Sequence, residues 1–210
     1  FDLDGLFAVA RQGVVAALAE EQPVVAHVDD TRCRRSGKKV SGVSWQRDPL
    51  GPHFRTQFVW ANRFLQISLS LPDGPIPCAA RAIPVHFQHC PTARKPRRND
   101  PAEVWADWKA LRKQQRLPQI AAQRIAQLRT DLNADPLGKK KVLVVCFDGG
   151  FTNAAVVKSP PPNTVLIGRI RKDAKLYGLP DPAQAKARGR KKIYGAPLPL
   201  SLIHISEPTR

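Results

Sequence analysis

Methionine is absent from the chain, which begins at Phe1. A complete natural protein starts with methionine, so we expect these 210 residues to be a fragment of a longer protein. Acids at Asp2 and Asp4 stand where a signal peptide would carry basic residues. No apolar run reaches the roughly 20 residues that a membrane-spanning helix needs. The sequence predicts neither secretion nor a membrane span, and we expect a cytoplasmic protein.

Cysteine is scarce as well, and no two cysteines form a C-x-x-C pair. Cys146 lies inside an apolar stretch, where a reduced and packed thiol is the usual state. The remaining cysteines are Cys33, Cys78 and Cys90. This usage favours free thiols over a disulfide framework or a structural zinc site.

Acidic residues are few beside the basic ones: 17 Asp and Glu against 34 Lys and Arg, for a net charge of +17. Such an excess favours a polyanionic partner, first nucleic acid and second an acidic membrane surface. A basic protein with a solvated surface, such as a ribosomal or scaffold protein, is the alternative. The basic residues gather at positions 32–39, 94–98, 169–172 and 186–192.

Apolar stretches of strand type alternate with stretches of helical spacing, which predicts an α/β fold built on one mixed sheet. A hydrophobic content of 42% with 24% charged residues is typical of a soluble globular chain. Strands are expected at 24–29, 56–62, 64–71, 142–147 and 164–171, with a further one near 83–87, and helices at 5–20, 101–115, 118–133 and 153–157.

Four local features carry more specific expectations. The segment Ala61-Asn62-Arg63 is expected to turn between two antiparallel strands, and residues 40–52 are expected to form a loop. Asp100 is the expected N-cap of the helix that follows it. Trp105 and Trp108 are expected to anchor that helix in the core.

Two of the expected strands stop at carboxylates. The run Val24–Val28 leads into Asp29 and Asp30, and the run Val142–Phe147 leads into Asp148. Acids at strand ends are often turn residues in water, and that is the alternative here. Carboxylates are costly to bury, however, and two such strand ends at one edge of a sheet would bring them together. Oxygen ligands of this kind suit a hard divalent cation such as Mg²⁺.

The order of these segments resembles the DDE transposases of bacterial insertion sequences. It runs from the apolar strand and Asp-Asp-Thr, through a basic loop with Gly-Lys-Lys, a β-hairpin and two helices, to Asp-Gly-Gly-Phe-Thr-Asn. Leu-Ile-Gly-Arg-Ile-Arg-Lys-Asp follows, and residues 188–195 are similar to the family's glycine- and arginine-rich element. The resemblance covers about residues 24–195. It implies a ribonuclease H-like mixed sheet flanked by helices, incomplete at its C-terminus.

The resemblance also implies metal-dependent cleavage and transfer of DNA strands, in which acids hold two Mg²⁺ or Mn²⁺ ions. The first acid corresponds to Asp30, with Asp29 as the alternative because a shift of one residue exchanges their faces. The second acid corresponds to Asp148. The residues expected to bind DNA are Arg34, Arg35, Lys38, Lys39, Arg169, Arg171, Lys172, Arg188, Arg190, Lys191 and Lys192.

The family's third acid, a glutamate, has no counterpart in the chain, so the fragment itself is expected to be inactive. Residues 200–210 resemble the translation of a sequencing-library adapter, and biological sequence is then expected to end near Pro199. On this interpretation Glu207 is not the missing acid. A genuine amphipathic tail is the alternative.

The expected organisation is a helix at 1–23, a partial catalytic domain at 24–199 and a non-native tail at 200–210, with an N-terminal DNA-binding domain missing. The expected partners are transposon ends and target DNA, and the intact protein is expected to form a homodimer. We expect the protein to be associated with a bacterial nucleoid and not with a membrane. Two other functions stay open. One is an inactive relative that only binds DNA, and the other is a nuclease of the same fold.

Overall fold

The computed structural model describes residues 2–37, 39–48, 50–52, 54–73, 79–170, 177–178, 180–181 and 193–198. By its internal contacts the chain divides into two compact units, Phe1–Arg169 and Ile170–Arg210. The helices and strands described below all lie in the first unit. In the second unit, Tyr177 and Pro197 form an isolated antiparallel bridge, and the rings of Tyr177 and Tyr194 lie 5.2 Å apart.

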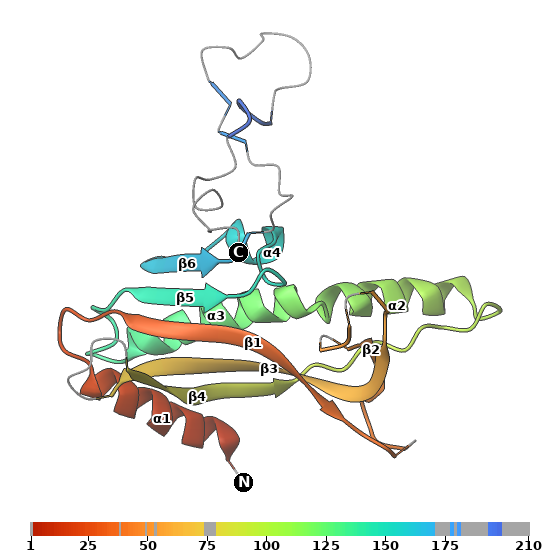
Figure 1. The fold of residues 1–210 in the computed structure, drawn as a ribbon, viewed down its shortest axis with the longest axis horizontal. Coiled ribbons are helices and arrows are strands. Elements are labelled where there is room, and N and C mark those ends of the chain that lie inside the picture. Colours follow the sequence, from red (N-terminus) through yellow and green to blue (C-terminus); the bar gives the residue numbers. More distant parts are fainter. Residues whose placement is uncertain are drawn as a thin grey trace. The chain divides into compact units, whose positions relative to one another are not determined.

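Six strands form one mixed sheet (Figure 1). β3 pairs antiparallel with β1, β2 and β4, whereas β5 pairs parallel with both β1 and β6. Together with the helices, this sheet confirms the expected α/β class and is consistent with a ribonuclease H-like fold. The strands are β1 (Val24–Arg34), β2 (Ser44–Arg47), β3 (Phe58–Pro72), β4 (Ala80–His89), β5 (Leu143–Phe147) and β6 (Thr164–Gly168).

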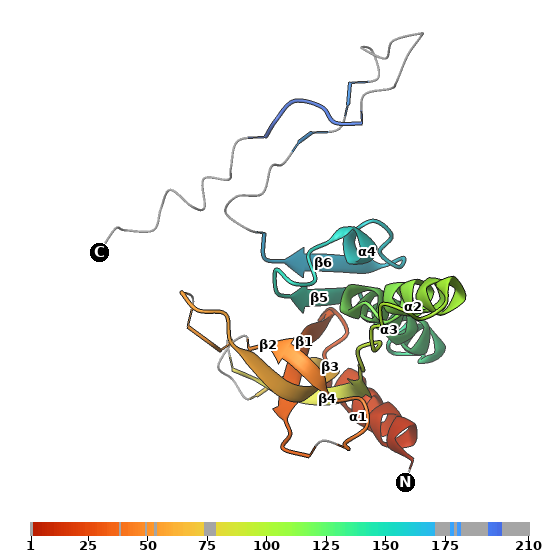
Figure 2. The ribbon, with the colours of Figure 1, turned by 90° about the vertical axis from the view of Figure 1, so that its right-hand side faces the viewer.

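The helices cover one face of the sheet. Figure 2 shows α1 (Leu3–Ala17), α2 (Ala102–Gln114) and α3 (Leu117–Ala134) on the same side of the strands. The short helix α4 (Ala154–Val157) joins β5 to β6. The opposite face, over β1 and its neighbours, carries no helix within the described part of the chain.

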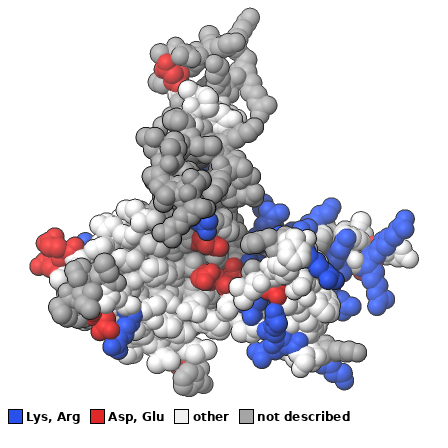
Figure 3. Space-filling view, in the orientation of Figure 1, with Lys and Arg blue, Asp and Glu red and all other residues white. Residues whose placement is uncertain are grey.

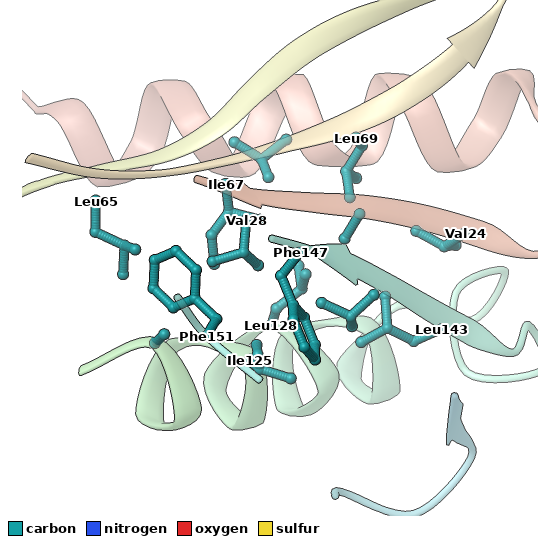
Figure 4. Packing of buried hydrophobic residues seen from close by; sticks show 14 of the residues in the cluster. Val24, Val28, Leu65, Ile67, Leu69, Ile125, Leu128, Leu143, Phe147 and Phe151 are labelled. Atoms are coloured by element: carbon teal, nitrogen blue, oxygen red, sulfur yellow. The ribbon is translucent and has the colours of Figure 1, made fainter. Parts of the chain in front are cut away.

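The hydrophobic core lies between the sheet and this layer of helices. Val24 and Val28 of β1 are buried, whereas His27 between them is exposed, as the alternation of a strand requires. Figure 4 shows strand residues packing against Ile125 and Leu128, which lie on one face of α3. The sheet is therefore fixed against α3, and the end of β5 is held in a defined register against the middle of β1.

Two local expectations about the strands are wrong. β3 runs without a break from Phe58 to Pro72, so the segment Ala61–Arg63 forms no turn. Its Asn62 finds partners inside the sheet, because the side-chain amide donates to the carbonyl of Ser41 at 3.1 Å and lies 2.9 Å from Nε2 of His89. The expected loop at 40–52 contains β2, whose Trp45 pairs with Trp60 of β3.

The expectations about the start and the packing of α2 are also wrong. The N-cap is Pro101, and the carboxylate of Asp100 instead accepts a hydrogen bond from the N–H of Arg97 at 2.7 Å. No residue of α2 is buried. Trp105 and Trp108 are half-buried and pack edge to face on each other, with ring centroids 5.7 Å apart. The aromatic rings of α2 are thus available to neighbouring cations instead of the core.

Candidate metal centre and nucleic-acid interface

The parallel strands β1 and β5 bring two carboxylates to the same place. Their register pairs Val28 with Phe147, and one position further along each strand stand Asp29 and Asp148. Both acids are exposed, and Asp29 lies on the face opposite the buried Val28. Figure 3 views the side that the helices leave open and shows acidic side chains gathered near its middle. The register therefore places Asp29 and Asp148 side by side at the end of β5.

The loop after β5 holds Asp148 in a fixed position. Its Oδ1 accepts a hydrogen bond from the N–H of Gly150 at 2.9 Å, the geometry of an Asx turn. Its backbone carbonyl accepts from the N–H of Phe151 at 3.2 Å, and Phe151 is buried in the core (Figure 4). Within the described part of the chain, Oδ2 of Asp148 has no hydrogen-bond partner. One carboxylate oxygen is therefore used to shape the loop and the other is free to bind a ligand.

Asp30 lies in a different environment from Asp29. It follows Val28 on the helix-covered face, and only 14% of its side chain is exposed. Its Oδ2 accepts from Nε of Arg63 at 2.8 Å and lies 3.3 Å from Nη2 of Arg32. Two guanidinium groups thus compensate the charge that a metal ion would otherwise neutralise. The geometry favours Asp29 over Asp30 as the neighbour of Asp148.

A pair of exposed carboxylates fits the chemistry of a hard divalent cation. Mg²⁺ prefers oxygen ligands, keeps several waters and often takes only one or two protein carboxylates. Among the described residues, no group of three or more histidine, cysteine, aspartate or glutamate side chains could hold a metal ion. In this part of the chain, the oxygen atoms that could hold such an ion are those of Asp29 and Asp148.

The structure describes four of the residues expected to bind DNA and leaves the others outside the described part of the chain. Arg34 is 70% exposed and pairs with Asp48 at 2.8 Å, while Nε of Arg35 donates to Oδ1 of Asn62 at 3.3 Å. Lys39 and Arg169 are exposed. The others lie outside the described residues, namely Lys38, Arg171, Lys172, Arg188, Arg190, Lys191 and Lys192.

Sequence reasoning missed three arginines next to the acids. Arg63 lies within the segment expected to be a turn, and Arg112 and Arg116 lie around the end of α2. All three line a cavity of about 280 Å³ together with Asp30 and Gly150. Figure 3 shows further basic side chains gathered to the right of the acidic ones, where α2 lies in Figure 1. A helical-wheel view of α2 would have shown its charge but not its position beside β1.

A comparison with protein-family models gives one match, which is described as DDE superfamily endonuclease and covers residues 2–208. The chain belongs to this family. DDE superfamily endonucleases act on DNA, with cleavage chemistry of the transposase type, and they generally use divalent metal ions. No curated protein and no solved structure matches the chain. In the described part of this endonuclease, no helix is long and apolar enough to cross a membrane.

Proposed function

We propose that this DDE superfamily endonuclease is the catalytic part of an insertion-sequence transposase, which cleaves transposon ends and joins them to target DNA by metal-dependent phosphoryl transfer. The observation that carries the proposal is the register of β1 and β5. It brings Asp29, in the middle of β1, beside Asp148, which directly follows β5, on an open face of the sheet. A site on an open face can be reached by a substrate as large as a DNA duplex.

Each acid has a defined role in the proposed site. Asp29 and Asp148 would hold the divalent ions, whose chemistry would be to activate a water or a 3′-hydroxyl and to stabilise the leaving oxygen. Gly150 orients the carboxylate of Asp148 through its N–H. Asp30, paired with Arg63 and Arg32, fixes the middle of β1 against β3 and so positions Asp29. The exposed cations Lys39 and Arg169 contact the DNA backbone.

The first experiment tests the metal site directly. Mn²⁺ or Mg²⁺ is titrated against the wild-type chain and the variants Asp29→Asn and Asp148→Asn, with binding followed by calorimetry. Loss of a direct ligand is expected to weaken metal binding at least ~10-fold, since even outer-shell partners of a metal are worth about that much. Asp30→Asn is the matched control, because it removes the same charge one residue away.

Three outcomes are informative. Equal binding by Asp148→Asn and the wild type would leave Asp148 as a structural turn residue and remove the support for a metal-dependent enzyme. A large loss in Asp30→Asn with none in Asp29→Asn would move the first ligand to Asp30. Loss in Asp29→Asn and Asp148→Asn, with Asp30→Asn close to wild type, is the expected result.

An inactive DNA-binding relative is a second candidate function. It is favoured by the lack of a third acid near Asp29 and Asp148 among the described residues. Nicking of a supercoiled plasmid in Mn²⁺ separates the two: nicking that Asp148→Asn abolishes supports the enzyme. Tight DNA binding without nicking, together with Mn²⁺ binding that Asp148→Asn leaves unchanged, supports the relative that only binds.

A further inference from the structure

A second cluster of functional groups lies around Asp30, on the face of β1 opposite Asp29. A cavity of about 280 Å³ opens between the middle of β1 and β3, the α2–α3 turn and the loop after β5. We call it the arginine pocket. The polar residues that line it are Asp30, Arg63, Thr92, Arg112, Gln115 and Arg116.

Most of the positive charge of the arginine pocket has no acidic partner among the described residues. Of its three arginines, only Arg63 has a carboxylate partner, the pocket's own Asp30. Within the described part of the chain, neither Arg112 nor Arg116 forms an ion pair. Two guanidinium groups without counter-ions therefore face one cavity, and each offers several N–H donors suited to oxygen anions.

Contacts with neighbouring groups hold the guanidinium of Arg112 in position. The Cζ atom of Arg112 lies 5.1 Å from the ring centroid of Trp108, a cation–π arrangement. Nε1 of Trp108 in turn donates to the carbonyl of Ala93, another residue of the pocket wall, at 3.2 Å. Trp108 thus contacts both the guanidinium of Arg112 and the backbone of Ala93. Such contacts reduce the entropy that Arg112 loses when it binds a ligand.

The pocket also contains a polar group that lacks a partner. Oε1 of Gln115 is buried and accepts no hydrogen bond from the described residues. A buried amide group without a partner costs free energy, which a polar ligand in the cavity would recover. Rotation of the amide by half a turn exchanges Oε1 for Nε2 and gives an additional donor toward an anion.

From these observations we propose that the arginine pocket binds a backbone phosphate of DNA, held by Arg112 and Arg116 with Arg63 contributing from the Asp30 pair. The inference rests on the proposed function for the identity of the substrate. Asp29 lies on the face of β1 opposite Asp30, which lines the pocket, whereas Gly150 of the pocket wall donates to the carboxylate of Asp148. Because Asp29 faces away from the pocket, the phosphate held there is a neighbour of the reacting phosphate, and it serves binding and register instead of the chemical step.

The test compares two double variants of the chain. Arg112→Gln with Arg116→Gln removes two charges from the pocket, whereas Lys109→Gln with Lys113→Gln removes two charges from α2 outside it. Arg112 and Arg116 are exposed, so the first variant is expected to fold normally, and circular dichroism checks this. Binding of a fluorescent DNA duplex is measured by anisotropy without divalent metal, over a range of sodium chloride concentrations.

The pocket variant is expected to bind DNA at least ~10-fold more weakly than the wild type, because charge-assisted hydrogen bonds to phosphate are the strong ones. The slope of log K against log salt is expected to fall by about 0.9, the value for one phosphate contact, and not by twice that. The lysine variant is expected to lose much less. Equal losses in the two variants would overturn the pocket and leave only a general charge effect.

Two further measurements separate the possible failures. If the wild type itself does not bind DNA, the proposed function fails; if it binds and the two variants behave alike, only the pocket fails. Mn²⁺ titration of the pocket variant is expected to match the wild type. Replacing chloride by inorganic phosphate at equal ionic strength should leave the difference between variants unchanged, whereas loss of that difference would assign the pocket to free phosphate and overturn the assignment to DNA.

Discussion

Gly168 shows how closely the residues around Asp148 are packed. A Cβ atom at Gly168 would overlap Cε2 of Phe147 and lie 2.6 Å from Oγ1 of Thr152. Phe147 immediately precedes Asp148, and Thr152 belongs to the loop that follows it. Oγ1 of Thr152 also donates to the carbonyl of Arg169 at 2.9 Å, which ties this loop to the end of β6. Any side chain at position 168 must therefore displace the segment that carries Asp148.

The substitution Gly168→Ala is expected to lower the free energy of unfolding by about 1–3 kcal/mol, the usual cost of overpacking. It should also weaken Mn²⁺ binding, because the carboxylate of Asp148 moves with its loop. Gly13→Ala is the control, since no atom lies within 4 Å of the added carbon and Gly13 is inside α1. That change is expected to stabilise the chain by about 0.5–1 kcal/mol. Urea unfolding measures both, and equal stability of Gly168→Ala and the wild type would contradict the packing argument.

At this scale the sequence singled out three acids and preferred Asp30 as the first metal ligand, with Asp29 as the alternative, and these roles stay predictions. The choice depends on the register of β1 against β5, and a shift of one residue turns every side chain to the other face. The sequence did not predict the ion-pair partner of Asp30 either. Arg63 lies 33 residues away along the chain, and only the pairing of β1 with β3 brings the two together.

At the scale of elements, one buried arginine joins α3 to the segment that leads into β5. Only 2% of Arg129 is exposed. Its Nη1 donates to the carbonyl of Lys141 at 2.8 Å and its Nη2 to the carbonyl of Gly138 at 3.1 Å. Burial lowers the pKa of Arg129, because desolvation disfavours the charged form. The guanidinium thus satisfies two carbonyls of a tight connection, and β5 enters the sheet directly after it.

Replacing Arg129 by leucine is expected to lower the free energy of unfolding by about 3 kcal/mol, since two hydrogen bonds from a charged group are lost. The carbonyl of Lys141 keeps Nδ2 of Asn163 as a donor, and that of Gly138 keeps the N–H of Lys141. Arg98→Leu, at an exposed position, serves as the control and should change stability by no more than about 0.5 kcal/mol. Thermal and urea unfolding of the two variants provide the measurement. A loss below about 1 kcal/mol in Arg129→Leu would mean that water replaces the guanidinium at these carbonyls.

Periodicity predicted the existence of most elements, because a packed face repeats along a strand or a helix. It failed where long-range pairing decides the structure. The continuous strand β3 crosses a segment with turn-like residues because Asn62 finds partners at Ser41 and His89. The short strand β2 forms because β3 offers it an edge, with Trp45 opposite Trp60. Neither partner could be read from the local sequence.

At the scale of the whole molecule, the distribution of charge favours two kinds of ligand, a polyanion and a divalent cation. The chain carries a net charge of +17, yet the exposed acids Asp29 and Asp148 stand together on the open face of the sheet. Basic side chains gather beside them in Figure 3. A polyanion is attracted by the overall field, while a divalent cation is attracted locally by the pair of carboxylates. Bound DNA would in turn supply phosphate oxygens for that cation.

This distribution leads to a prediction for the whole chain. Binding to a DNA duplex should be mainly electrostatic and nearly independent of base sequence, because the described basic groups offer contacts to phosphates. With about four such contacts, affinity should fall roughly 100-fold between 50 and 200 mM salt, as released counter-ions require. Anisotropy titrations with two duplexes of unrelated sequence, in the presence of EDTA, measure both properties. Affinity that hardly changes with salt, or that differs strongly between the duplexes, would show that base contacts or apolar contacts dominate instead.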